Sequence, residues 1–246
     1  MLINTDFNFV NRKFKAVELP FPEHIEEIRQ RLFALVLIIF LLTFFSFVEI
    51  KNIVKILEYP IQSVKFFQTA PGEYFISTVK IAFYTGFLFT SPFAISQFIL
   101  FLLPGVTKKE AKFILPLLIG SIVLFGTGLL FSYYTLIPAA LNFFLNYSED
   151  VLEPFWSFDQ YFEFILVLFY STGIAFQIPI IQILLGVFNI ISASKMLKAW
   201  RYIVLISTIL GAILTPSTDP LTQMLLSVAI LFLYLAGVGV LFLIKH

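Results

Sequence analysis

The sequence contains no cysteine and only two histidines, His24 and His246. Without cysteine the chain forms no disulfide, thiolate nucleophile, zinc–thiolate site or iron–sulfur cluster. Both histidines lie outside the long apolar runs, which excludes a bis-histidine haem and a serine–histidine protease inside a membrane. The formal net charge of +1 provides no basic field for phosphate groups, so we expect no nucleic-acid partner. We also expect no enzyme activity, no cofactor and no metal site.

Charged residues are scarce as well, at 13% of the 246 residues, whereas apolar residues reach 59% and include 32 phenylalanines. A soluble domain of this length needs far more polar surface, but lipid accepts apolar side chains on the outside of a protein. The first charge-free run starts at Leu32, after a polar segment that does not resemble a cleaved secretory signal. The composition therefore predicts an all-α integral membrane protein.

Charge-free runs and turn signals predict six transmembrane helices in a single domain, residues 1–246. A helix needs about 20 apolar residues to cross roughly 30 Å of hydrocarbon. The third run is too long for one span, and Pro138 is expected to follow its exit near Tyr134. The turn-forming residues 215–220 separate a short fifth helix from a short sixth one. The expected spans are residues 32–49, 78–102, 113–135, 161–187, 202–214 and 221–243.

Basic residues are distributed unequally between the two faces that this topology creates. Twelve of the sixteen lie on the face that carries both termini. By the positive-inside rule, that face is the cytoplasmic or stromal one. On the opposite face, residues 49–75 are long enough to form a structured outer loop, with bends at Pro60 and at Pro71–Gly72.

A small-molecule transporter or permease is the alternative function for such a chain. Transporters typically contain internal repeats, broken helices and polar groups at mid-membrane. This sequence has no evident repeat and one such element, Gln177 followed by Pro179. It therefore favours a protein that offers recognition surfaces.

Five segments follow one another in the order and at about the spacing of a known family pattern. Residues 24–32 fit H-x-x-E-L-R-x-R-L, with Ile28 in place of the leucine. The other four are P-x-E-x-F at 71–75, the run from Ser91-Pro92 to Glu110, F-Q-x-P at 176–179, and the outer turn at 214–223. Together they resemble the TatC family, the multi-span receptor subunit of the twin-arginine (Sec-independent) protein translocase.

The resemblance implies a non-enzymatic receptor that binds twin-arginine signal peptides and admits folded cargo, with transport driven by the proton gradient. The implied partners are single-span subunits with amphipathic helices (TatA/TatB-like), docked near residues 202–243, and further copies of this chain.

The 32 phenylalanines beside only 11 glycines indicate AT-rich coding, which is typical of organelle genomes. We therefore expect a multi-pass protein of the plastid thylakoid membrane, with a bacterial inner membrane as the alternative.

Two carboxylates, Glu27 and Glu110, are the implied ligands of the arginine pair. A guanidinium presents a fork of donors that a carboxylate matches with both oxygens. The two residues lie on the same expected face, one before the first span and one after the second. Simpler interpretations stay open, because Glu27 can pair with Arg31 one helical turn away, and Glu110 can offset neighbouring lysines.

Three further residues complete the implied signal-peptide site. Arg29 is expected to support the pocket or anchor it at the interface, and Phe101 and Pro104 are expected to form its walls. Phe101 and Pro104 also suit ordinary packing at the end of a span.

Four other residues have implied roles outside that site. Gln177 is expected to face the protein interior, for a helix–helix hydrogen bond or for a part in transport. Asp219 is either a cap of the sixth helix or a functional carboxylate. Pro60 and Glu73 are expected to shape the outer loop.

Overall fold

The computed structural model describes residues 21–61, 65–101, 112–148, 155–215 and 219–245. In this part of the chain, five helices are long and apolar enough to cross a membrane, at residues 25–48, 73–101, 114–147, 158–187 and 220–244. A shorter apolar helix covers Trp200–Leu214. The predicted class, a helical membrane protein, is confirmed, and these helices are compatible with six spans.

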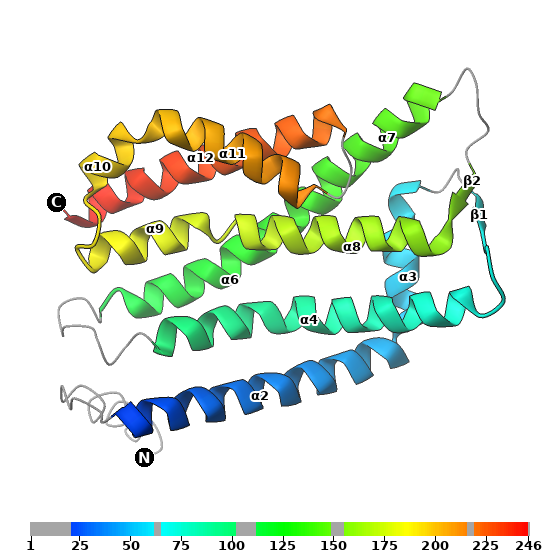
Figure 1. The fold of residues 1–246 in the computed structure, drawn as a ribbon, viewed down its shortest axis with the longest axis horizontal. Helices are drawn as coiled ribbons and strands as arrows, with labels where there is room; N and C mark the ends of the chain where they lie inside the picture. Colours follow the sequence, from blue (N-terminus) through cyan, green and yellow to red (C-terminus); the bar gives the residue numbers. More distant parts are fainter. Residues whose placement is uncertain (1–20, 62–64, 102–111, 149–154, 216–218, 246) are drawn as a thin grey trace, which may run out of the picture.

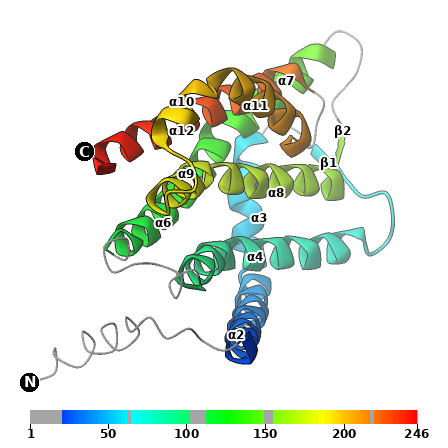
Figure 2. The same ribbon diagram turned by 60° about the vertical axis from the view of Figure 1, so that its left-hand side comes forward.

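Helix α2 (Phe21–Val48) lies at one edge of the bundle and packs beside α4 (Glu73–Phe101), as Figures 1 and 2 show. Only 6% of the apolar window of α2 is buried, because α4 is its main neighbour. Helix α2 begins and α12 (Pro220–Lys245) ends at the same end of the bundle. Following the expected orientation, we call this the inner end and the opposite end the outer end.

Helix α6 (Ile114–Phe131) continues through a π-helical turn (Ser132–Leu136) into α7 (Ile137–Ser148). The helix therefore does not end at the expected exit near Tyr134 and runs on past Pro138. In a regular helix, the proline ring would collide with a carbonyl group one turn back. The π turn, in which the Ile137 N–H bonds to the Ser132 carbonyl oxygen, widens the backbone ahead of the ring and lets the helix continue.

The centre of the bundle is formed by α8 (Phe158–Ala175) and α9 (Ile178–Val187), whose apolar window is 67% buried. Fully buried Phe162, Ile165 and Leu168 of α8 share one core cluster with Ile81 of α4. The two helices are separate because Pro179 lacks the N–H that a continuous helix would use. This break places Gln177 between them, in the interior.

The outer end carries a short amphipathic helix, a helical turn and two short strands. These are α3 (Ile50–Glu58), η1 (Tyr59–Ile61), β1 (Lys65–Phe67) and β2 (Phe155–Ser157). The strands pair in parallel, with Phe66 opposite Trp156, which adds a small ladder to the predicted all-α fold. Pro60 lies in η1, and Gly72, with a φ of 86°, forms the bend before α4. The expected outer loop is therefore a folded structure.

The last three helices are α10 (Ala193–Lys198), α11 (Trp200–Leu214) and α12. Of the fifth and sixth helices, which were both expected to be short, only α11 is. It has 15 residues, whereas α12 has 26. The expectation of a short sixth helix is wrong, because α12 begins at Pro220, a residue that fits the first helical position, and continues apolar almost to the end of the chain.

Candidate signal-peptide site and outer cap

Glu27 and Arg31 lie one turn apart on the same face of α2, at the inner end. The Arg31 guanidinium donates to Glu27 Oε1 through Nη2 at 2.6 Å and through Nε at 3.2 Å. The side chains are only 24% and 18% exposed, so the pair is substantially withdrawn from water. The simpler interpretation of Glu27, a helix-surface pair, is thus present in the structure, but in a more buried form than such pairs usually take.

Gln97 of α4 holds the other side of the same guanidinium. Arg31 Nη1 donates to Gln97 Oε1 at 2.8 Å and to the Gln97 carbonyl oxygen at 3.2 Å. That carbonyl lies four residues before Phe101, near the C-terminal end of α4, where the helix dipole favours a cation. No role for Gln97 was predicted from the sequence, although a polar side chain close to the end of an apolar span is a signal of one.

The remaining predicted residues of the signal-peptide site are placed differently. Arg29 is 76% exposed and pairs with Glu26, its Nη2 lying 2.6 Å from Glu26 Oε1. Phe101 is the last residue of α4, at the inner end near Gln97, and it is half-buried. Pro104 and Glu110 lie outside the described residues. The structure therefore brings Glu27 together with Arg31 and Gln97.

Gln177 is buried, with 6% of its surface exposed, in the break between α8 and α9. Its amide Nε2 donates to the Ser121 carbonyl oxygen of α6 at 3.2 Å. Its Oε1 has no hydrogen-bond partner within the described part of the chain. The side chain links two helices through one bond, which is the geometry of an interhelical contact.

Asp219 has the geometry of an N-cap for α12. Its Oδ1 accepts a hydrogen bond from the Thr222 backbone N–H at 2.8 Å, and its Oδ2 accepts one from the Thr222 hydroxyl. Asp219 is 2% exposed, so the bond to the third helical residue satisfies a buried backbone donor. Pro220, which has no N–H to satisfy, occupies the first helical position.

Glu73 joins the segment before α4 to strand β2. Its Oε2 accepts bonds from the Thr69 backbone N–H, from the Thr69 hydroxyl at 2.6 Å and from the Ala70 N–H at 3.1 Å. Its Oε1 accepts a bond from the Ser157 hydroxyl at 3.1 Å. One carboxylate thus connects residues from two distant parts of the sequence. We call this arrangement, with β1 and β2, the outer cap.

A second polar contact at the outer end joins α4 to α8. Lys80 Nζ lies 2.8 and 3.0 Å from the two carboxylate oxygens of Asp159, which also accepts a bond from the Ser77 hydroxyl at 2.7 Å. Glu163 lies farther from Lys80, at 3.8 Å. This pair could not be predicted from the sequence, because it depends on α4 and α8 being neighbours.

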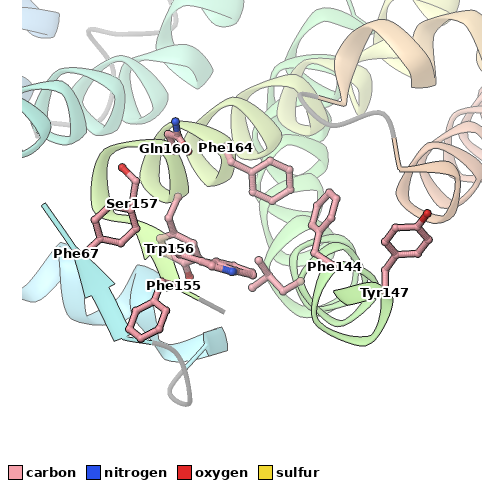
Figure 3. Close-up of a pocket in the computed structure, with 10 residues that line it drawn as sticks. Phe67, Phe144, Tyr147, Phe155, Trp156, Ser157, Gln160 and Phe164 are labelled. Carbon is pink, nitrogen blue, oxygen red and sulfur yellow. The ribbon is translucent and has the colours of Figure 1, made fainter. Parts of the chain in front are cut away.

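Between α7 and the outer cap lies an aromatic hollow of about 480 Å³. Figure 3 shows Trp156 of β2 on one side of it, with Phe144 of α7 and Phe164 of α8 on the other. No charged residue lines it among those the structure describes. Tyr161 forms part of its wall and donates to the Leu57 carbonyl oxygen of α3 at 2.9 Å, which ties α8 to the outer segment.

Comparison with known proteins identifies the family. Residues 23–228 match the family model of the Sec-independent protein translocase protein TatC. The chain belongs to the TatC family. The match includes the α2 residues Glu27 and Arg31, the break at Gln177 and the start of α12.

Relatives of the TatC family cover nearly the whole chain. A TatC-like protein (ycf43) of Trieres chinensis is 73% identical over all of this chain and 94% of its own length. The translocase protein TatC of Synechocystis is 50% identical over 91% of this chain and 88% of its own. The chloroplastic TatC of Pisum sativum is 50% identical over 89% of this chain, which spans 63% of the longer pea protein.

A solved structure also shares the fold. A crystal structure of a twin-arginine translocase receptor, TatC in the detergent DDM, superposes with a TM-score of 0.77 at 32% identity, covering 88% of this chain and 98% of its own. The resemblance found in the sequence is therefore confirmed. As a member of the TatC family, this chain is a membrane subunit of the Tat protein translocase, with a role in protein transport.

Proposed function

We propose that this chain is the receptor of its translocase and binds twin-arginine signal peptides at the inner end of α2, with Glu27 as one ligand. The observation that carries the proposal is the half-buried Glu27 carboxylate, which already accepts two hydrogen bonds from a guanidinium. A solved relative with the same fold is itself described as a twin-arginine translocase receptor. Glu110 would take the second arginine.

The chemistry of Glu27 suits arginine better than lysine. A guanidinium donates in a planar fork, whereas an ammonium group is a compact, strongly hydrated charge. In a partly desolvated site, a carboxylate–guanidinium contact is stronger than the ~1 kcal/mol or less of an exposed pair. The receptor should therefore prefer a twin-arginine peptide to its twin-lysine variant.

A binding measurement with the full-length chain in lipid nanodiscs tests this proposal. Glu27→Gln and Glu110→Gln should each weaken binding of a twin-arginine peptide about tenfold or more, which is about 1.4 kcal/mol. Glu26→Gln is the matched control, because Glu26 is the adjacent carboxylate on α2 and its side chain is more exposed, at 44% against 24% for Glu27. Equal affinity for the wild type and both variants, or for the two peptides, would refute the receptor role.

The partner subunits of the proposal are single-span proteins that dock along α11 and α12. Helix α11 turns Ser207 and Gly211 inward toward α12, while Leu205 and Ile213 are 62% and 72% exposed. In a bilayer these exposed side chains face lipid or a neighbouring helix. Photocrosslinkers at Leu205 and Ile213 should capture a single-span subunit, whereas one at Phe40 of α2 should not. Crosslinks from Phe40 alone would place the partner elsewhere.

We also propose that six helices span a thylakoid membrane, with both termini in the stroma. The absence of cysteine makes the topology testable, since each single-cysteine variant reports one position. An impermeant maleimide should label Lys198→Cys from the stromal side and Lys51→Cys only from the other side. Fractionation of plastids should recover the chain with thylakoids, and recovery with the envelope would contradict that location.

A further inference from the structure

The guanidinium of Arg31 is held between two helices by acceptors on both of its sides. Glu27 of α2 binds Nη2 and Nε, while the side chain and the backbone carbonyl of Gln97 of α4 bind Nη1. Arg31 therefore has two independent sets of partners. If either set is lost, the other still holds the guanidinium at the inner end of the bundle, Glu27 on α2 or Gln97 on α4.

An incoming arginine that uses both oxygens of Glu27 has to take Oε1 from Arg31. That oxygen accepts both of the hydrogen bonds from Arg31, the shorter at 2.6 Å. Two guanidiniums at one carboxylate repel each other, so a peptide arginine binds well only when Arg31 moves toward Gln97. The two Gln97 acceptors, which already bind Nη1, and the negative end of the α4 dipole hold the guanidinium there once it has left Glu27.

We infer that Arg31 occupies, in the peptide-free receptor, the position at Glu27 that a signal-peptide arginine takes, and that Gln97 sets how readily Arg31 yields it. This inference rests on the proposed function. It makes signal-peptide binding an exchange of one guanidinium for another. Arg31 and Gln97 then set the affinity for the signal peptide, although neither is required for binding. Because Arg31 can return to Glu27, it also favours release of the peptide.

The exchange predicts the direction of the affinity change for three single variants in the peptide-binding measurement. Arg31→Gln removes the competitor and should raise the affinity about three- to tenfold. Gln97→Glu draws Arg31 away from Glu27 and should raise it as well. Gln97→Leu removes the side-chain acceptor, leaves Arg31 on Glu27 and should lower the affinity about threefold. In the Arg31→Gln background, both substitutions at position 97 should lose their effect.

Two comparisons separate the exchange from other causes. Arg29→Gln removes a positive charge two residues away, from an exposed side chain that does not contact Glu27 through any bond described above, so it is the reference for losing a charge at this end of α2. The double variant Arg31→Gln/Gln97→Glu measures any direct attraction between the new carboxylate and the peptide. The gain from Arg31→Gln should exceed the Arg29→Gln reference, and the double variant should bind like Arg31→Gln alone.

Several results would overturn the inference while leaving the receptor role intact. One is an Arg31→Gln variant that melts like the wild type but binds no better than the Arg29→Gln reference. Another is a Gln97→Leu effect that persists without Arg31. If Arg31→Gln does not fold, the position-97 series in the wild-type background decides, because Gln97→Leu and Gln97→Glu must shift affinity in opposite directions. If Glu27→Gln bound the twin-arginine peptide as tightly as the wild type, that result would instead count against the proposed function.

Discussion

Gly86 of α4 lies directly against the backbone of Thr43 in α2. A methyl group at position 86 would lie 2.6 Å from the Thr43 nitrogen and 2.7 Å from its Cα. These are main-chain atoms, which cannot rotate away as a side-chain end could. The absence of a side chain at Gly86 is therefore what allows α2 to approach α4 so closely, in the way that small residues allow elsewhere in membrane proteins.

Gly86→Ala should push α2 away from α4. We expect a loss of about 1–3 kcal/mol, the usual effect of overpacking a tight contact. Thermal unfolding in detergent, followed by tryptophan fluorescence, measures it. Gly126→Ala and Gly239→Ala are the controls, because an added methyl meets nothing within 4 Å at either position. Equal melting of all three variants would mean that the α2–α4 contact is looser than described.

Replacing Glu73 by glutamine should loosen the outer cap. The amide keeps the shape of the carboxylate but presents an NH₂ group to the Thr69 or Ser157 donors, which then lack an acceptor. Hydrogen exchange should become at least several-fold faster at residues 69–73 and 155–157, and stay unchanged in α9. Glu163→Gln, which alters an exposed carboxylate on α8, serves as the control and should leave these amides protected.

The Lys80–Asp159 pair should couple α4 to α8. Lys80→Met and Asp159→Asn should each cost about 0.5–1 kcal/mol, because the partners are partly exposed and such pairs are modest. A double-mutant cycle should give a double variant that loses less than the sum. The coupling should weaken in high salt. Strict additivity would show that the two side chains do not interact in solution.

Loss of the Asp219 cap should destabilise the start of α12. Asp219→Ala removes both bonds to Thr222 and should cost about 1 kcal/mol, whereas Asp219→Asn keeps one acceptor and should cost less. Hydrogen exchange at residues 221–223 reports the effect locally. An alanine variant that exchanges like the wild type would assign Asp219 another role.

Gln177→Leu should change stability by less than about 1 kcal/mol, because single interhelical hydrogen bonds in membrane proteins average about 0.6 kcal/mol. The Gln177 amide makes one bond, to Ser121, and the substitution also removes an oxygen that has no partner among the described residues. Thermal unfolding measures the change. Complete loss of folding would mean that Gln177 stabilises the structure by more than its single hydrogen bond to Ser121 of α6.

The sequence allowed good predictions where local chemistry decides the structure. The charge-free runs located the apolar helices, and the residues around Asp219 marked the start of α12, but the break between α8 and α9 inside the expected span 161–187 was not predicted. It did not predict contacts that depend on which helices are neighbours. The bond from Arg31 to Gln97 and the pairing of Lys80 with Asp159 both needed the packing of α4 against two other helices.

Pro138 shows why the sequence did not reveal that the helix continues beyond Tyr134. A proline normally ends a helix or kinks it, so an exit near Tyr134 was the natural expectation. The π turn at Ser132–Leu136 removes the clash by shifting a single hydrogen bond, and nothing in the residue pattern distinguishes that turn from ordinary helix. Helices α8 and α12 pack against this turn, and we infer that this packing, and not the local sequence, decides whether the helix continues past Pro138.

The uninterrupted helix from Ile114 to Tyr147 has a consequence for the outer face. Its 34 residues rise about 51 Å at 1.5 Å each, against roughly 30 Å of hydrocarbon. Even at a steep tilt of about 40°, it would stand about 10 Å taller than the apolar layer. The last turns of α7 would then stand above the apolar layer, and the aromatic hollow that Phe144 and Tyr147 line would lie at the level of the lipid headgroups or beyond them.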